Sequence, residues 1–133
     1  MTNEEFTKLL YSLADAWAKR DYMAAISAFA DDVRYADPLR YSMSSKGELQ
    51  KFFQDDEGYT QSTVWHTILF DERQQVGAAE YTYNGTHRYH GTVLVKIRED
   101  KISRWREYQH IDGREWGEFI SGTSFRTDVW EII

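Results

Sequence analysis

The segment Lys101–Tyr108 reads Lys-Ile-Ser-Arg-Trp-Arg-Glu-Tyr and predicts the last strand of a β-sheet. Side chains alternate between the two faces of a strand, so Arg104 and Arg106 share one face, and Trp105 and Glu107 share the other. Arginine side chains prefer water. We therefore predict that Trp105 and Glu107 point toward the interior of the protein.

An inward Glu107 is a candidate functional carboxylate, because an ionised carboxylate without a partner is costly to bury. The preceding strand turns only apolar side chains to the same face, namely Val93, Val95 and Ile97. Burial without a neighbouring cation predicts a raised pKa for Glu107. The alternative interpretation is structural: Glu107 lies at an open rim or pairs with an interior Arg or Lys.

The sequence around this strand predicts a four-stranded meander that follows three helices. Stretches rich in Val, Ile, Thr, Tyr and Trp are separated by turn residues, and they cover Ser62 to Phe70, Gln74 to Tyr83, Thr86 to Arg98 and Lys101 to Ile111. This order is typical of an α+β fold. We expect a cone-shaped, curved antiparallel sheet, covered on its concave face by about three N-terminal helices.

The helical segments carry their own start signals. Thr2 and Ser45 each have a glutamate three residues on, as in a capping box, and Asp21 is a candidate cap for a short middle helix. That middle helix is predicted to bury Met23, Ile26 and Phe29 and to end at Asp31-Asp32. A short strand, 33–35, should follow before Asp37-Pro38. From Asp112, a tail with Phe125 and Trp130 is predicted to form a short helix or an irregular closure.

The composition restricts the possible partners. The 133 residues fit a single domain, 1–133, with net charge −6, no cysteine and no basic run. A disulfide scaffold and a thiolate metal site are excluded, and nucleic acid and membrane surfaces are poor partners for this charge. We expect a cytoplasmic protein without a metal ion or cofactor. The 16% aromatic content favours an aromatic-lined pocket for a small apolar molecule or a self-association face.

Further site candidates are weaker. Asp37 precedes the only proline, which is also ordinary turn chemistry, and Tyr35 shares its face. Trp65 and Tyr83 are either pocket walls or core residues. His90 lies near a strand end, and the four histidines show no metal-ligand spacing. The exposed face of the last strand carries Arg104, Arg106, Tyr108 and His110, a composition that predicts a homodimer interface.

The chain resembles the nuclear transport factor 2-like superfamily from about Phe6 to Phe119, and within it the SnoaL-like branch. That branch includes polyketide cyclases, ketosteroid isomerase and limonene epoxide hydrolase. The resemblance is carried by the segment ending in Asp37-Pro38 and by the closing strand, whose Trp105-Arg106-Glu107-Tyr108 is similar to the Trp-Arg-Asp-Tyr of the epoxide hydrolase.

The resemblance implies acid/base roles for Glu107 and Asp37, with Trp105 and Tyr35 beside them. Two departures limit what is carried over. Leu13 and Val93 stand where the isomerase has its hydrogen-bond donors, which argues against steroid isomerisation. Glu80, Tyr81 and Thr82 stand where the hydrolase has an Arg-x-Asp pair. Two readings remain: a cofactor-independent isomerase, cyclase or hydrolase, or a non-catalytic ligand-binding or dimerisation module.

Overall fold

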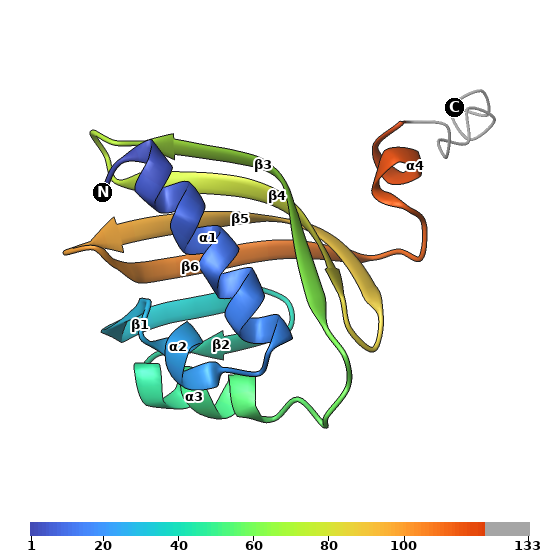
Figure 1. The fold of residues 1–133 in the computed structure, drawn as a ribbon, viewed down its shortest axis with the longest axis horizontal. Coiled ribbons are helices and arrows are strands. Elements are labelled where there is room, and N and C mark those ends of the chain that lie inside the picture. The colour runs from blue at the N-terminus through green and yellow to red at the C-terminus, as the bar shows by residue number, and fades with distance from the viewer. Residues whose placement is uncertain (122–133) are drawn as a thin grey trace.

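The computed structural model describes residues 1–121, which form one curved sheet with helices on its concave side (Figure 1). The Phe125 and Trp130 part of the predicted tail lies outside these residues. The helices are α1 (Asn3–Ala18), α2 (Tyr22–Ile26), α3 (Lys46–Gln54) and α4 (Trp116–Ile120). The strands are β1 (Phe29–Asp37), β2 (Tyr41–Met43), β3 (Ser62–Asp71), β4 (Val76–Asn84), β5 (Arg88–Arg98) and β6 (Lys101–Ile111).

The sheet has six strands in the order β2-β1-β6-β5-β4-β3. The predicted four-strand meander is confirmed as β3 to β6, and β6 has the predicted bounds. Two features extend the prediction. β1 is nine residues long and pairs with β6 in parallel, and β2 adds an antiparallel edge strand to β1. The sheet is therefore mixed.

The predicted helix caps are confirmed. Thr2 and Glu5 form a reciprocal capping box at α1, and the side chains of Asp21 and Ser45 accept hydrogen bonds at the starts of α2 and α3. The middle helix is shorter than predicted, because it ends at Ile26 and not at Asp31-Asp32. Met23 is 67% exposed, contrary to the prediction, and Phe29 is buried as part of β1.

The core lies between α1 and the concave face of the sheet. The ring of Phe6 in α1 lies so close to Gly77 in β4 that a Cβ at position 77 would come within 2.3 Å of it. Trp105 stacks on Tyr35 with ring centroids 5.4 Å apart and meets Trp17 of α1 edge-on at 5.9 Å. The inward orientation predicted for Trp105 is therefore what the structure shows.

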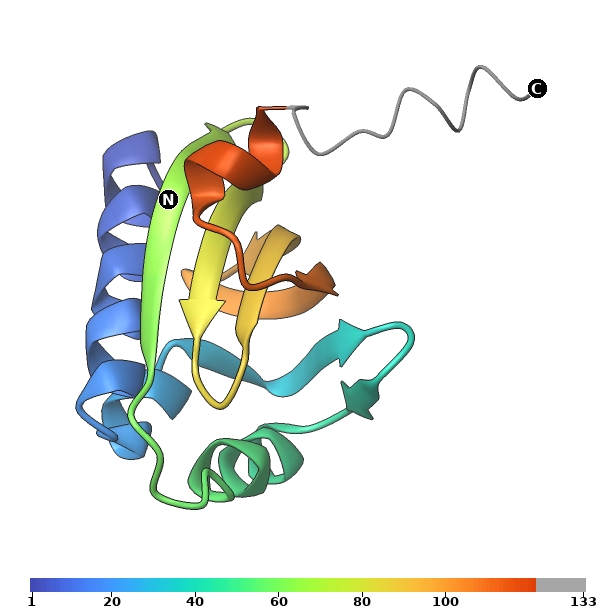
Figure 2. The same ribbon diagram turned by 90° about the vertical axis from the view of Figure 1, so that its right-hand side faces the viewer.

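The opposite face of the sheet is covered in part by α4, while α3 and β2 close one end of the concave side (Figure 2). Trp116 of α4 stacks on His66 of β3 with ring centroids 4.1 Å apart. Within residues 1–121, no helix is long and apolar enough to cross a membrane.

Candidate functional site

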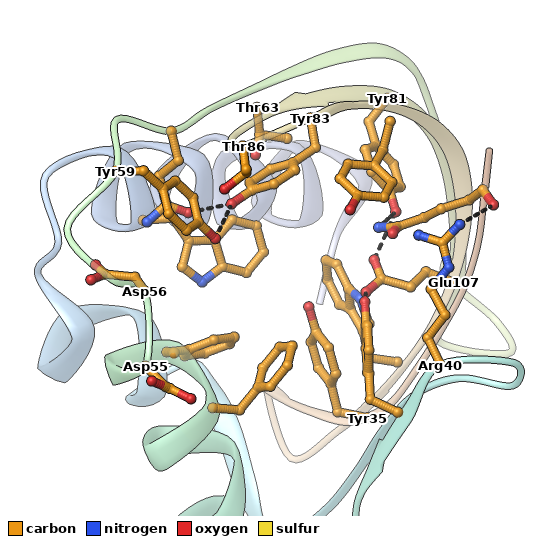
Figure 3. A pocket seen from close by; sticks show the side chains of 18 of the residues that line it. Tyr35, Arg40, Asp55, Asp56, Tyr59, Thr63, Tyr81, Tyr83, Thr86 and Glu107 are labelled. Atoms are coloured by element: carbon orange, nitrogen blue, oxygen red, sulfur yellow. Dashed lines mark hydrogen bonds between the residues drawn. The ribbon is translucent and has the colours of Figure 1, made fainter. Parts of the chain in front are cut away.

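A cavity of about 360 Å³ lies between the concave sheet and helices α1 and α3 (Figure 3). Twelve of its twenty lining side chains are Trp, Tyr or Phe. Figure 3 shows Glu107 and Arg40 toward one end of the cavity and Asp55, Asp56 and Tyr59 toward the other. An apolar cavity with a few polar groups is the usual form of a small-molecule site.

Glu107 is 4% exposed and is held by neutral donors. The Tyr41 hydroxyl donates to its Oε1 atom, and the Tyr81 hydroxyl donates to its Oε2 atom at 2.7 Å. Gln109 supports this arrangement, because its side-chain amide donates to the Tyr81 oxygen at 2.6 Å. We call Glu107, Tyr41, Tyr81 and Gln109 the cavity cluster.

Strand register explains how the cavity cluster forms. Tyr81 of β4 lies opposite Gly91 of β5, and Gly91 lies opposite Gln109 of β6. A Cβ at Gly91 would come within 2.9 Å of both the Tyr81 ring and the Tyr108 carbonyl oxygen. Because Gly91 has no side chain, the Tyr81 ring can lie across β5 and reach the carboxylate on β6.

Burial raises the pKa of Glu107 above its ordinary value, and this effect outweighs the hydrogen bonds from Tyr41 and Tyr81, which favour the anion. The charge of Asp37 raises the pKa of Glu107 further. Burial and the nearby carboxylate also raise the pKa values of Tyr41 and Tyr81, so both phenols stay protonated and remain donors. A carboxyl with a raised pKa beside an apolar cavity holds its proton to a higher pH than an exposed glutamate does and is a candidate acid or base.

The far end of the cavity holds a second polar group of residues. The Tyr22 hydroxyl donates to Asp56, and Gln61 donates to the Tyr22 oxygen at 3.1 Å. Tyr83 donates to the Gln61 carbonyl at 3.0 Å, and the hydroxyls of Tyr59 and Tyr83 are 3.3 Å apart. Burial, followed by the hydrogen bond to Asp56, raises the pKa of Tyr22 to about 12. We call these five residues the distal chain.

The structure brings five of the eight predicted site residues together at the cavity. They are Tyr35, Trp65, Tyr83, Trp105 and Glu107.

The other three do not line it. Asp37 is buried, but its Oδ1 atom accepts the Leu39 backbone N–H at 3.0 Å, the turn chemistry that was its alternative interpretation. Glu80 and His90 lie on the outer face of the sheet, because they alternate with the inward Tyr81 and Tyr89.

Sequence reasoning missed Tyr41 and Tyr81. It predicted Glu107 without a partner because it searched the inner faces for a cation, whereas the partners are phenols. Two features of the sequence could have identified Tyr81. It is two residues from Tyr83 on β4 and therefore points to the same face, and a glycine lies in the next strand. Tyr41 was missed because it lies in β2, a strand that the sequence analysis did not predict.

Comparisons with known proteins identify the fold. No family model and no curated protein matches the sequence. Among solved structures, an LEH-like epoxide hydrolase of M. tuberculosis is 15% identical with a TM-score of 0.70, covering 80% of this chain and 84% of that one.

Two further structures agree with it. A cystatin-like protein of unknown function from Methylobium petroleophilum is 14% identical with a TM-score of 0.75, and the match covers 87% of this chain and 82% of that one. A hypothetical protein with a ketosteroid isomerase-like fold from Catenulispora acidiphila, in complex with trimethylamine, is 16% identical with a TM-score of 0.66, and the match covers 75% of this chain and 83% of that one. The chain therefore has the nuclear transport factor 2-like, cystatin-like fold that its sequence resembles.

Proposed function

We propose that this protein binds a small, mostly apolar molecule in the aromatic cavity and that Glu107 transfers a proton to or from it. The observation that carries the proposal is a buried carboxyl group with a raised pKa, held by two phenols at the wall of a cavity large enough for a ligand. The chemistry is of the isomerase, cyclase or hydrolase type and uses no cofactor.

The proposal gives each member of the cavity cluster a role. Glu107 is the general acid or base, because its carboxylate faces the cavity. Tyr41 and Tyr81 are positioning residues that orient the carboxylate and stabilise its charge when it forms. Asp37 acts only through its charge on Glu107, since it does not line the cavity. The epoxide hydrolase and the trimethylamine complex among the structural neighbours support a small-molecule ligand.

A neutral bicyclic probe, 5-nitrobenzisoxazole, tests proton abstraction without knowledge of the natural substrate. The carboxylate removes the C3 proton, the C–H electrons form the nitrile C≡N bond, the N–O bond breaks, and the oxygen leaves as a coloured phenolate. We expect turnover by the native protein, with a rate that rises with pH as Glu107 deprotonates.

The Glu107→Gln variant should lose about a hundredfold or more of this rate, which is the usual contribution of a general base. Thr82→Val, which alters the outer face of the sheet, is the matched control and should retain it. Equal rates in the native protein and Glu107→Gln would refute the acid/base role.

We also propose that the protein forms a homodimer through the outer sheet face and acts in the cytoplasm. Arg104, Arg106 and Tyr108 are exposed on that face, and they can therefore form the dimer interface predicted from their composition.

A non-catalytic dimerisation module is the second candidate function. Light scattering at micromolar concentration should give twice the mass of the chain, and Tyr108→Glu should reduce it to one.

A further inference from the structure

The hydrogen bonds of the distal chain run in one direction. Tyr83 uses its proton on the Gln61 carbonyl, so the contact between Tyr59 and Tyr83 must be donated by Tyr59. Gln61 then donates to Tyr22, and Tyr22 donates to Asp56. The hydroxyl protons of all three tyrosines are therefore committed within the protein, and none is left for a ligand.

Asp56 closes the chain and is itself satisfied. Its Oδ1 atom accepts the Gly58 backbone N–H at 2.9 Å, and Arg20 lies 3.3 Å from its Oδ2 atom. This carboxylate is therefore an anchor for the tyrosines and not a free acceptor for a ligand.

The cavity instead keeps unpartnered polar groups elsewhere. Among residues 1–121, four buried side-chain polar atoms lack a hydrogen-bond partner of good geometry, and three belong to side chains that line this cavity. Trp105 Nε1 is one of them, but it interacts with Glu107, so Trp17 Nε1 and Thr63 Oγ1 are the two that remain for a ligand. Trp17 is only 9% exposed. A buried donor without a partner is costly, which makes such groups candidates for a ligand contact.

Thr63 lies away from Glu107. Thr63 is opposite Tyr83 in the β3–β4 register, whereas Tyr81, which holds Glu107, is opposite Trp65. The two positions are separated by two residues along a strand, or about 7 Å. Figure 3 shows Thr63 beside Tyr83 and away from Glu107.

We infer that the unpartnered groups of Trp17 and Thr63 bind an uncharged hydrogen-bond acceptor of the ligand, a carbonyl, ether or hydroxyl oxygen, which at Thr63 lies about 7 Å or more from the atom that faces Glu107. The inference rests on the proposed function and narrows its substrate class to neutral molecules with an apolar body and at least one oxygen acceptor.

The charges around the cavity argue against an anionic ligand. An anion would meet Asp55, Asp56 and Glu107 on the lining. Arg40, the only cation among the described lining residues, packs over the Tyr89 ring at the Glu107 end. Aromatic faces attract cations, but the indole N–H of Trp17 presents a positive edge, which repels an ammonium group and attracts a carbonyl oxygen.

Four naphthalene probes with the same ring test this assignment: 2-acetylnaphthalene, 2-ethylnaphthalene, 2-naphthoate and trimethyl(2-naphthyl)ammonium. Dissociation constants are measured by quenching of the protein's tryptophan fluorescence and checked by calorimetry. We expect 2-acetylnaphthalene to bind most tightly and 2-naphthoate most weakly.

Trp17→Phe keeps a six-membered aromatic ring but removes the N–H together with the five-membered ring, and Thr63→Val keeps the shape and removes the hydroxyl. At least one of them should weaken 2-acetylnaphthalene binding roughly threefold to tenfold, the effect of one hydrogen bond, and leave 2-ethylnaphthalene binding unchanged. Trp116→Phe, the same substitution on the outer face, is the control and should change neither.

Each other result overturns the inference. If 2-ethylnaphthalene binds as tightly as 2-acetylnaphthalene, or if neither variant distinguishes the two, the cavity does not bind the oxygen through these residues, while the proposed function stands. If an ion binds most tightly, the substrate class is wrong. If no probe binds and 5-nitrobenzisoxazole is not turned over, the proposed function fails as well.

Discussion

The two faces of the central sheet each bury a small polar cluster, and the clusters differ in how far their hydrogen bonds are satisfied. On the outer face, His66 Nε2 lies 2.7 Å from Thr82 Oγ1, which lies 2.9 Å from His90 Nδ1, and His90 Nε2 lies 2.7 Å from the Arg114 carbonyl oxygen. The carbonyl can only accept, so His90 carries its proton on Nε2, and Thr82 donates to Nδ1. We call these residues the outer cluster.

In the outer cluster, the Thr82 hydroxyl and both ring nitrogens of His90 have hydrogen-bond partners, and His90 is only 1% exposed. This closed arrangement fixes the segment before α4 to the sheet. The cavity cluster, by contrast, lies beside a void, and the same cavity is lined by buried polar atoms without partners among residues 1–121. The comparison separates a polar cluster that stabilises the fold from one that is available to a ligand.

The largest expected effect is the loss of the ring that supports the cavity. Trp105→Ala should reduce the free energy of unfolding by roughly 3–5 kcal/mol, because it removes a fully buried aromatic side chain. Trp116→Ala on the outer face should cost much less, because Trp116 is only partly buried. Urea denaturation measures both. Equal losses would mean that the two faces contribute alike to stability.

A matched threonine pair sharpens the contrast. Thr82→Val should cost about 1–3 kcal/mol of unfolding free energy, because it leaves the buried His90 Nδ1 and the partly buried His66 Nε2 without a partner. Thr63→Val should be nearly neutral or stabilising, because the Thr63 hydroxyl has no partner to lose among the described residues. Thermal unfolding of the two variants decides the question. A large loss in Thr63→Val would show that its hydroxyl is satisfied in solution.

The smallest expected effect is the change in the free energy of unfolding with pH. Burial raises the pKa of Glu107, so its charged form costs stability as pH rises through the unfolded-state value, and the cost is complete above the folded-state pKa. His66 shows the opposite trend. Burial lowers its pKa, so the protonation of His66 costs stability as pH falls through the unfolded histidine value near 6.5.

Glu107→Gln should therefore gain stability relative to the native protein as pH increases from 4 to 8, and His66→Gln should gain it as pH decreases from 8 to 5. Urea denaturation across this range measures both trends. A Glu107→Gln variant that is clearly less stable than the native protein at pH 8 would show that the carboxylate is structural.

The sequence predicted the elements whose pattern is local. The bounds of β6, the inward direction of Trp105 and Glu107, and the three helix caps follow from alternation and from side chains that cap their own helix. The pairing of β1 with β6 could not be predicted this way, because it joins strands far apart in the chain.

The candidate site was also predictable only where the sequence pattern is local. Glu107 was found because parity alone places it inside. Its donors were missed because Tyr41 arrives through the unpredicted β2, and Tyr81 reaches Glu107 only across Gly91. Asp37 was predicted as a site residue because its position resembles that of a catalytic residue in the similar family, but its carboxylate accepts a hydrogen bond from the backbone of its own turn.

The central claim is that Glu107 carries a proton that it can exchange near neutral pH. The direct test is a carbon-detected NMR titration of the glutamate side-chain carboxyls between pH 3 and 9, with the Glu107 resonance assigned by its loss in Glu107→Gln. The account predicts a midpoint for Glu107 clearly above that of the exposed glutamates and a further increase in Tyr81→Phe, which removes a donor to the anion. A midpoint at or below that of the exposed glutamates would contradict it.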